Sequence, residues 1–367
     1  MKSRLGVVAV PRSRLDPPGE DAMSDPGLQP SRSLSISRPL LQLALLFVRM
    51  GPGLLLLALV IFFGLASHVF LTTANFRNIL SQSSVDAALA LGMLPVILTR
   101  ALDLSVSSTL AVSTVICAKV YTDHPHTGPF IIPLFLLIGL AVGFVNGLLI
   151  VRLNLNVPLI VTLGTLYAVQ SLAYVISGGA TIVGMPHGVS ALTNSKFLTL
   201  PIEVTVIAAC GIVMSIFLRQ MAWGRWIYAI GGSPEAARRV GIPVRRVLFS
   251  TYLICGMFAG VAGMLVASAS DAGYSTAGGL SNLDAIAAVV IGGASLYGGR
   301  GGVLGTLIGA VVLGTVYNGL VLTNVSPNWT PFAVGGILIF AVGLDVVRTR
   351  LEGSLRLRQA MLEAGAQ

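Results

Sequence analysis

Four ionisable residues lie within or beside apolar segments of this 367-residue chain: Asp86, Arg100, Asp103 and Asp284. A charge at the centre of a bilayer costs about 2.5–3.5 kcal/mol on insertion scales, so such residues suggest a function, for example a proton relay. Their positions favour a simpler interpretation, in which each lies near a helix end, with Asp86 and Asp284 in the outer halves of their segments. Asp103 precedes Leu-Ser-Val-Ser-Ser and is also a candidate cap for the next helix.

Two asparagines, Asn146 and Asn318, each occur in an Asn-Gly-Leu triplet inside an apolar segment. A buried amide needs hydrogen-bond partners, and hydrogen bonding between helices is the favoured role. The alternative is a polar translocation path lined by Asp103, Asn146, Asp284 and Asn318.

Signatures of catalysis do not occur in the sequence. The glycine-rich stretch 292–302 lacks the Lys-Ser/Thr pair of a phosphate-binding loop, and Cys117, Cys210 and Cys255 are scattered singly in apolar runs. No nucleophile, base and orienting group occur together. The sequence therefore predicts no enzyme, no metal site and no cofactor bound by this chain.

The composition is that of a membrane protein. Hydrophobic residues make up 54% and charged residues 10%, against about 25% charged residues in soluble domains. The 42 glycines are spread through apolar runs, as in packed membrane helices. With no basic patch interleaved with aromatic residues, nucleic acid is not an expected partner. We expect an all-α polytopic membrane protein in contact with the lipid bilayer.

Ten segments are proposed as membrane spans, in a permease domain covering residues 50–347. Residues 1–49 are expected to form a disordered cytoplasmic tail with a short interfacial lead-in, and 348–367 a cytoplasmic C-terminal tail. The proposed spans are residues 51–71, 78–98, 104–120, 130–151, 158–176, 202–221, 248–267, 284–297, 303–322 and 331–347. The segment 284–297 is short enough to be a partial or broken helix.

Basic residues set the orientation of these spans. With the N-terminus inside, only Arg77, Lys119 and Lys196 of the 23 Lys and Arg residues fall on the outer side. This is a strong positive-inside bias. It places both termini and the polar segment 222–247 in the cytoplasm, and it leaves 177–201 as the one long outer loop.

The sequence of the cytoplasmic segment 222–247 predicts a short helix and indicates where it starts. The Ser233 hydroxyl can accept a hydrogen bond from the first turn, and Pro234 suits the first helical position. Glu235 places negative charge at the positive end of the helix dipole. Ala236 and Ala237 are strong helix formers.

The end of this helix is equally marked. Arg238 and Arg239 lie in its last turn, and Gly241 is a natural left-handed stop. Two turns are too few for a helix to be stable alone, so a partner must hold it. Four loop residues are expected to support it: Gly224, Arg225, Gly231 and Gly232. Docking on a cytoplasmic partner and a merely solvated turn are both compatible with these residues.

Five motifs in order resemble the permeases of ribose-type bacterial ATP-binding cassette importers, which take up monosaccharides. They are TRALDLSVSS (99–108), GFVNGLLI (143–150), PLIVTLGTL (158–166), GRWIYAIGGSPEAARRVGI (224–242) and LDAIAAVVIGGASLYGGRGG (283–302). The resemblance implies a permease in the bacterial inner membrane, paired with a second copy or a paralogue. It further implies a periplasmic sugar-binding protein and a cytoplasmic ATPase that binds ATP and receives the 233–241 helix as a coupling helix.

The chain departs from the family pattern Gly-Gly-Ile-Asp-Leu-Ser-Val-Gly-Ser, because Arg100, Ala101 and Ser107 replace its three glycines. Side chains at those positions affect stability or a passage if the backbone is tightly packed there. Two other functions remain open on the residues alone. One is a proton-coupled carrier that uses Asp86, Asp103 or Asp284, and the other is a membrane scaffold that transports nothing.

Overall fold

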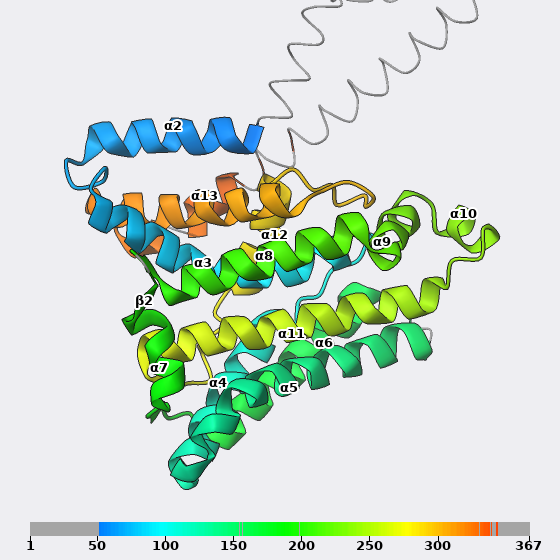
Figure 1. Cartoon of the computed structure of the whole chain (residues 1–367), viewed down its shortest axis with the longest axis horizontal. Coiled ribbons are helices and arrows are strands. Elements are labelled where there is room, and N and C mark those ends of the chain that lie inside the picture. The colour runs from blue at the N-terminus through cyan, green and yellow to red at the C-terminus, as the bar shows by residue number, and fades with distance from the viewer. Residues whose placement is uncertain are drawn as a thin grey trace, which may run out of the picture. The chain divides into compact units, whose positions relative to one another are not determined.

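The computed structural model describes residues 51–337, apart from 154, 156, 198 and 330, together with 339 and 343. The two predicted tails, 1–49 and 348–367, lie outside the described residues. Helices dominate the described chain, in agreement with the predicted all-α class (Figure 1). Four two-residue strands accompany them as two antiparallel pairs, β1 with β4 and β2 with β3.

The described chain is a succession of helices with a few short strands between them. In chain order they are α2 (Gly51–Ala66), α3 (Thr73–Leu98), α4 (Val106–Asp123), η2 (Pro125–Thr127), α5 (Gly128–Gly147), the π-helix η3 (Leu148–Arg152), α6 (Pro158–Ser177), β1 (Ile182–Val183), α7 (His187–Asn194), β2 (Lys196–Phe197), β3 (Leu200–Pro201), α8 (Ile202–Gln220), α9 (Ala222–Gly232), α10 (Pro234–Arg239), α11 (Val244–Ser270), β4 (Ala272–Gly273), α12 (Ser281–Ile291), α13 (Val303–Leu322) and η4 (Pro327–Trp329).

Among the described residues, six helical stretches are long and apolar enough to cross a membrane: α3, η2–α5–η3, α6, α8, α11 and α13. Helices α2 and α12 are apolar but shorter. Nine of the ten proposed spans coincide with a described helix. The tenth, 331–347, is helical at 331–337 and lies largely outside the described residues beyond that point.

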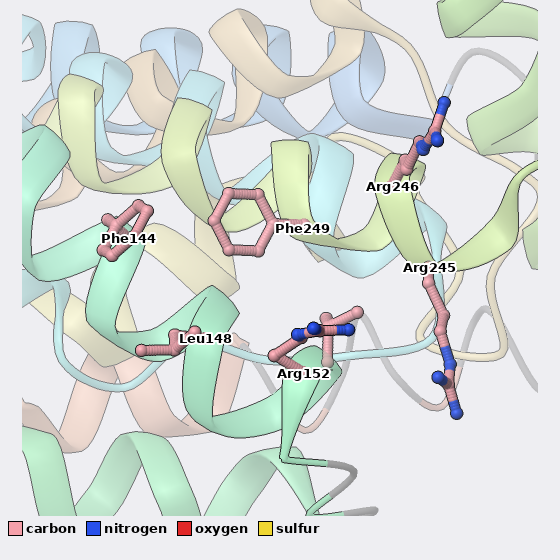
Figure 2. Close-up of a pocket in the computed structure, with 7 residues that line it drawn as sticks. Phe144, Leu148, Arg152, Arg245, Arg246 and Phe249 are labelled. Atoms are coloured by element: carbon pink, nitrogen blue, oxygen red, sulfur yellow. The ribbon is translucent and has the colours of Figure 1, made fainter.

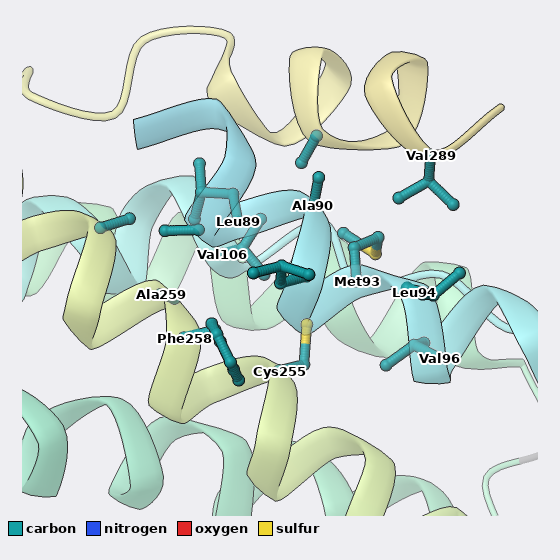
Figure 3. Packing of buried hydrophobic residues seen from close by; sticks show 14 of the residues in the cluster. Leu89, Ala90, Met93, Leu94, Val96, Val106, Cys255, Phe258, Ala259 and Val289 are labelled. Atoms are coloured by element: carbon teal, nitrogen blue, oxygen red, sulfur yellow. The ribbon is translucent and has the colours of Figure 1, made fainter. Parts of the chain in front are cut away.

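Helix α3 is the centre of the bundle. Every residue from Asp86 to Thr99 is buried. Figure 3 shows the apolar side chains of this half of α3 between Phe258 and Ala259 of α11 on one side and Val289 of α12 on the other. Because α3 is enclosed by protein, its neighbours and not the lipid determine its position.

Helices α5 and α11 form the most extensive helix pair, and glycine makes their contact possible. A Cβ atom added to Gly139 would lie 2.2 Å from the Gly256 carbonyl oxygen, and one added to Gly143 would lie 2.3 Å from the Tyr252 carbonyl oxygen. Small residues four apart allow this backbone approach, the usual device for packing membrane helices. A larger side chain at either glycine would force the two backbones apart.

The two ends of the bundle carry different structures. In Figure 1, α9 and α10 lie at one end of α8 and α11, whereas α7 and β2 lie at the opposite end. The predicted long outer loop 177–201 is thus an ordered cap, in which β1 pairs with β4 and α7 packs against α11, α5 and α8. The positive-inside bias of the sequence predicts that the α9–α10 end is the cytoplasmic one.

Helix α12 is a half-length helix, as the short segment 284–297 allowed. It ends at Ile291, so the predicted extension to residue 297 is wrong, because glycines at 292 and 293 stop the helix and 293 has a φ of 87°. Eleven residues rise about 16 Å, roughly half of the hydrocarbon thickness.

The preceding residues 274–280 form irregular turns against α4. The Tyr274 amide donates to Thr114, while a Cβ on Gly278 would lie 2.1 Å from the Ser107 carbonyl oxygen.

Candidate functional site

The residues predicted to support a cytoplasmic loop belong instead to a helix, α9. Buried positions in α9 are Gly224, Ile227, Ile230 and Gly231, a spacing of three to four residues that gives the helix one packed face. Gly224 approaches α8 so closely that an added Cβ would lie 2.3 Å from the Phe217 carbonyl oxygen. The loop prediction is wrong because these two isoleucines and two glycines form a buried helix face, with Trp223 and Trp226 partly buried beside it.

Helix α10 has both of the predicted ends. The Ser233 hydroxyl accepts a hydrogen bond from the Ala236 amide at 3.2 Å, and Pro234 occupies the first turn. At the other end Gly241 has a φ of 82°, its amide donates to the Arg238 carbonyl at 3.0 Å, and the Ile242 amide donates to the Ala237 carbonyl at 3.1 Å. This pair of bonds is a Schellman motif, which requires a left-handed residue and therefore favours glycine.

The surface of α10 is almost entirely free within the chain. Only Ala237 is buried, and it packs beneath the helix. The other side chains from Glu235 to Val240 are exposed, and Val240 is 76% exposed although it is apolar. The described chain therefore presents a capped helix with an acidic start, a basic end and an unpartnered apolar residue.

The junction between α9 and α10 is fixed by backbone contacts. A Cβ added to Gly231 would lie 1.9 Å from the Leu98 carbonyl oxygen, at the end of α3, and 2.4 Å from the Gly299 amide nitrogen. The Gly299 amide donates to the same Leu98 carbonyl at 2.9 Å. Gly232, by contrast, has no atom near its missing Cβ. The α9–α10 junction is thus packed against both α3 and the 292–302 loop.

Arg100 completes this junction. Its Nε donates to the Gly231 carbonyl at 2.7 Å and its Nη2 to the Gly232 carbonyl at 2.6 Å. These carbonyls end α9, where a positive charge is favoured by the helix dipole. Arg100 itself has a φ of 66°, a left-handed conformation at a position where the resembling family usually has glycine. The sequence identified this departure but gave no signal of the bonds to residues 231 and 232.

Two further side chains hold α9 in place. The Tyr228 hydroxyl donates to the Gly301 carbonyl at 3.0 Å, and the Trp223 indole donates to the Ser250 hydroxyl at 2.7 Å. Burial raises the pKa of the Tyr228 phenol, an effect that the nearby Arg219 charge partly offsets. The phenol therefore stays protonated and keeps its donor. The Arg225 side chain donates a hydrogen bond to the Gln220 carbonyl at 2.8 Å.

Asp103 and Asn146 come together in a closed polar cluster. The Asn146 amide lies 3.3 Å from both Asp103 carboxylate oxygens and 2.7 Å from the Ser105 hydroxyl. Asp103 also accepts from the Ser105 amide at 3.0 Å. This is a local turn and not the predicted cap, because α4 begins only at Val106. Asp103 is 1% exposed and Asn146 is fully buried, so the cluster joins the turn before α4 to α5.

Asn318 and Asp284 have separate partners. Asn318 and Asn75 exchange two amide hydrogen bonds of 2.9 Å between α13 and α3, the interhelical role favoured for this asparagine. Asp284, in the first turn of α12, bonds Tyr317 and lies near enough to Asp86 for their charges to interact. Asp86 lies at the middle of the 26-residue α3, so the favoured interpretation that it lies near a helix end is wrong. The helix begins at Thr73, where Thr72 caps it.

No group of three or more His, Cys, Asp and Glu side chains able to hold a metal occurs within the part of the chain that the structure describes.

Comparison with known proteins gives the family. A profile of the family described as "Branched-chain amino acid transport system / permease component" matches residues 75–342. The galactose/methyl galactoside import permease protein MglC of Haemophilus influenzae is 35% identical over 297 residues, which are 76% of this chain and 88% of that protein. The ribose import permease protein RbsC of Bacillus subtilis is 37% identical over 299 residues, covering 81% of this chain and 92% of that protein.

A more distant relative extends the range, and no solved structure matches the chain at a significant level. The D-allose transport system permease protein AlsC of Escherichia coli is 32% identical over 305 residues, or 82% of this chain and 93% of that protein. The profile and these relatives confirm the resemblance drawn from the five motifs. The chain belongs to this family of permease components and is a multi-pass inner-membrane transport subunit, not an enzyme, of an ATP-binding cassette importer.

Proposed function

We propose that the cargo of this importer is a monosaccharide. The observation that carries the proposal is the set of relatives, whose names specify galactose, ribose and allose, each aligned over more than three quarters of this chain. The family description names branched-chain amino acids, so that cargo class is the competing one. Specificity among sugars is expected to lie largely in a separate binding protein.

The test is uptake into proteoliposomes that contain the permease, its ATPase and its binding protein. We expect ATP-dependent accumulation of at least one labelled sugar from ribose, galactose, fructose and allose, and no accumulation of leucine. Uptake of leucine in preference to all four sugars would refute the proposal. Uptake that survives without ATP and collapses with the proton gradient would instead support the carrier that uses the Asp86–Asp284 pair.

We propose that α10 is the coupling helix and docks in a groove of the ATPase. Its caps support this role, because a frayed helix transmits little displacement, and its exposed side chains support it because they leave a surface for a partner. The close packing of Gly231 and the Arg100 bonds supply the second requirement, a rigid link to the end of α3. In this proposal the ATPase moves α10, and the spans then alternate between outward and inward openings.

Glu235→Arg and Gly241→Pro test this role. Both should separate ATP hydrolysis from uptake while membrane insertion stays normal, since Glu235 is exposed and Gly241 follows the helix. The control is Lys196→Glu, a charge reversal on an exposed residue of β2 at the opposite end of the bundle. Normal uptake by both α10 variants would refute the coupling role.

We also propose that a second permease copy, identical or paralogous, covers the face formed by residues 274–280 and the start of α12. Irregular backbone at membrane depth is tolerated only against protein or a water-filled cavity. Yet Thr276 and Gly279 are exposed in the single chain, and Leu280 is 57% exposed. A partner at this face would enclose the backbone and place Asp284 beside a shared translocation path.

The finer topology completes the proposal. It comprises ten spans within residues 50–347, a cytoplasmic coupling segment at 222–247, and cytoplasmic tails at 1–49 and 348–367. Support comes from the basic residues, whose bias places the α9–α10 end inside. Labelling of single cysteines at residues 20 and 360 from the outside of intact cells should fail if both tails are cytoplasmic.

A further inference from the structure

A groove separates α5 and η3 from the first turns of α11. It encloses about 430 Å³, within the roughly 300–1,000 Å³ of ordinary ligand sites. Seven residues line it: Phe144, Leu148, Val151, Arg152, Arg245, Arg246 and Phe249. None of the residues proposed for the α10 helix or for the translocation path is among them, although Arg245 and Arg246 lie at the end of the segment 222–247.

One end of the groove is apolar and open to the surroundings. Figure 2 shows Phe144 and Leu148 on one side, facing Phe249 of α11 on the other. The rings of Phe144 and Phe249 meet edge to face at 5.5 Å. Phe144 is 49% exposed and Leu148 37% exposed. Because both flanking helices belong to membrane spans, this end opens toward hydrocarbon.

The other end of the groove is basic. In Figure 2, Arg152 lies across the end of η3 beneath α11, while Arg245 and Arg246 project from the first turn of α11 in different directions. None of the described residues that line the groove is acidic. Three arginine side chains therefore surround its mouth at this end.

The local backbone builds this shape. Up to Gly147 the two helices touch, since an added Cβ there would lie 2.9 Å from the Phe249 ring. Immediately afterwards α5 changes into a π-helical turn, in which the Leu153 amide donates to the Leu148 carbonyl at 3.1 Å. The wider turn rotates Val151 and Arg152 relative to an uninterrupted α-helix. Such turns occur frequently at functional sites.

We propose that this groove binds one anionic phospholipid, with an acyl chain against Phe144, Leu148 and Phe249 and the headgroup phosphate on Arg152. The amphipathic lining matches that ligand, since basic pockets between spans at the cytoplasmic side suit anionic headgroups. Arg246 adds positive potential at the mouth. The site needs neither the ATPase nor the sugar, so it stands apart from the proposed function.

The experiment uses the full-length permease in nanodiscs of equal parts phosphatidylcholine and phosphatidylglycerol. Lipids retained after mild extraction are counted by native mass spectrometry. Wild-type protein should retain phosphatidylglycerol in preference. Arg152→Gln should lower that preference about fivefold, the contribution of one basic residue at an anionic surface, and Arg152→Gln with Arg246→Gln should lower it further. Leu148→Trp should reduce retained lipid by filling the apolar end while every arginine remains.

The matched control is Arg219→Gln, which removes an exposed arginine from the last turn of α8 at the same end of the bundle, away from the groove. An equal fall in this control, or no change in the Arg152 variants, would overturn the proposal. Displacement of the lipid by inorganic phosphate, with Leu148→Trp silent, would reveal a free-anion site and overturn it. Cross-linking from Leu148→Cys to the ATPase or to a second permease copy would overturn it in favour of a protein occupant.

Discussion

Arg100 offers the sharpest test of the energetics at the α9–α10 junction, because two opposing effects meet in one residue. Its left-handed backbone costs an ordinary residue about 1–2 kcal/mol relative to glycine. Its guanidinium makes two hydrogen bonds to the carbonyls of Gly231 and Gly232. Arg100→Ala and Arg100→Gly separate these effects, because both remove the guanidinium but only glycine relieves the backbone cost.

The magnitudes follow from the environment of each bond. Hydrogen bonds to charged groups contribute about 1.5–3 kcal/mol, but one of these two is only partly buried and the other is exposed, so solvent reduces their sum to about 2 kcal/mol. Arg100→Ala loses the bonds and keeps the backbone cost, which predicts a loss of about 2 kcal/mol. Arg100→Gly loses the bonds and regains about 1–2 kcal/mol of backbone free energy, so it should be nearly neutral.

The assay is the free energy of unfolding from denaturant titration in mixed micelles, combined with hydrogen exchange of the amides from 231 to 242. The alanine variant should unfold more easily than the glycine variant by about 1–2 kcal/mol. Both should exchange faster at the junction, because both lack the guanidinium. Arg100→Lys, which keeps the charge but not the two-pronged geometry, should exchange at an intermediate rate. Equal stability of the alanine and glycine variants would refute this reasoning.

Three other substitutions test the packing around the site. Gly143→Leu should prevent folding, because even a Cβ atom there would lie 2.3 Å from a backbone oxygen of α11. The control Gly164→Leu, whose added side chain has open space around it, should fold. Gel filtration in detergent compares the two variants. Asn318→Leu should cost about 1–3 kcal/mol, because the buried Asn75 Oδ1 loses its donor while Nδ2 keeps its bond to the Phe70 carbonyl. Asn75→Leu with Asn318→Leu should recover part of this loss, and additive losses in the double variant would contradict the pairing. Ser233→Ala should cost about 1 kcal/mol locally and speed exchange at the Ala236 amide, while unchanged exchange would count against the cap.

Helix α10 could be predicted in detail because its signals are local. Ser233, Pro234 and Gly241 act on their own helix through bonds that span at most five residues, and the structure has the expected cap and stop. Six of the ten proposed spans were accessible from length and apolar content, because the described helices there are long and apolar enough to cross a bilayer. The half-length α12 was suggested by its short apolar run, although its end was placed six residues too far along.

The contacts between distant parts of the chain could not be predicted. Arg100 bonds residues more than 130 positions away, and Asn75 meets Asn318 across 243 positions. The spacing of residues in the sequence does not show which helices are neighbours. The residue types indicate only that a buried polar side chain needs a hydrogen-bond partner. Helix α9 escaped prediction for a different reason, because its glycines at 224, 231 and 232 are typical of a loop.

The glycine contact between α5 and α11 has a consequence for how the protein is made. The end of α5 is synthesised about 100 residues before the start of α11, and translation at about 5–20 residues per second separates them by roughly 5–20 s. Throughout that interval the α5 surface around Gly139 and Gly143 contacts lipid or another apolar helix. Insertion is therefore finished long before assembly, and a nascent chain halted after α8 would leave its best helix-binding surface unoccupied. The permease depends on its late-made helix to close the part of the bundle made early.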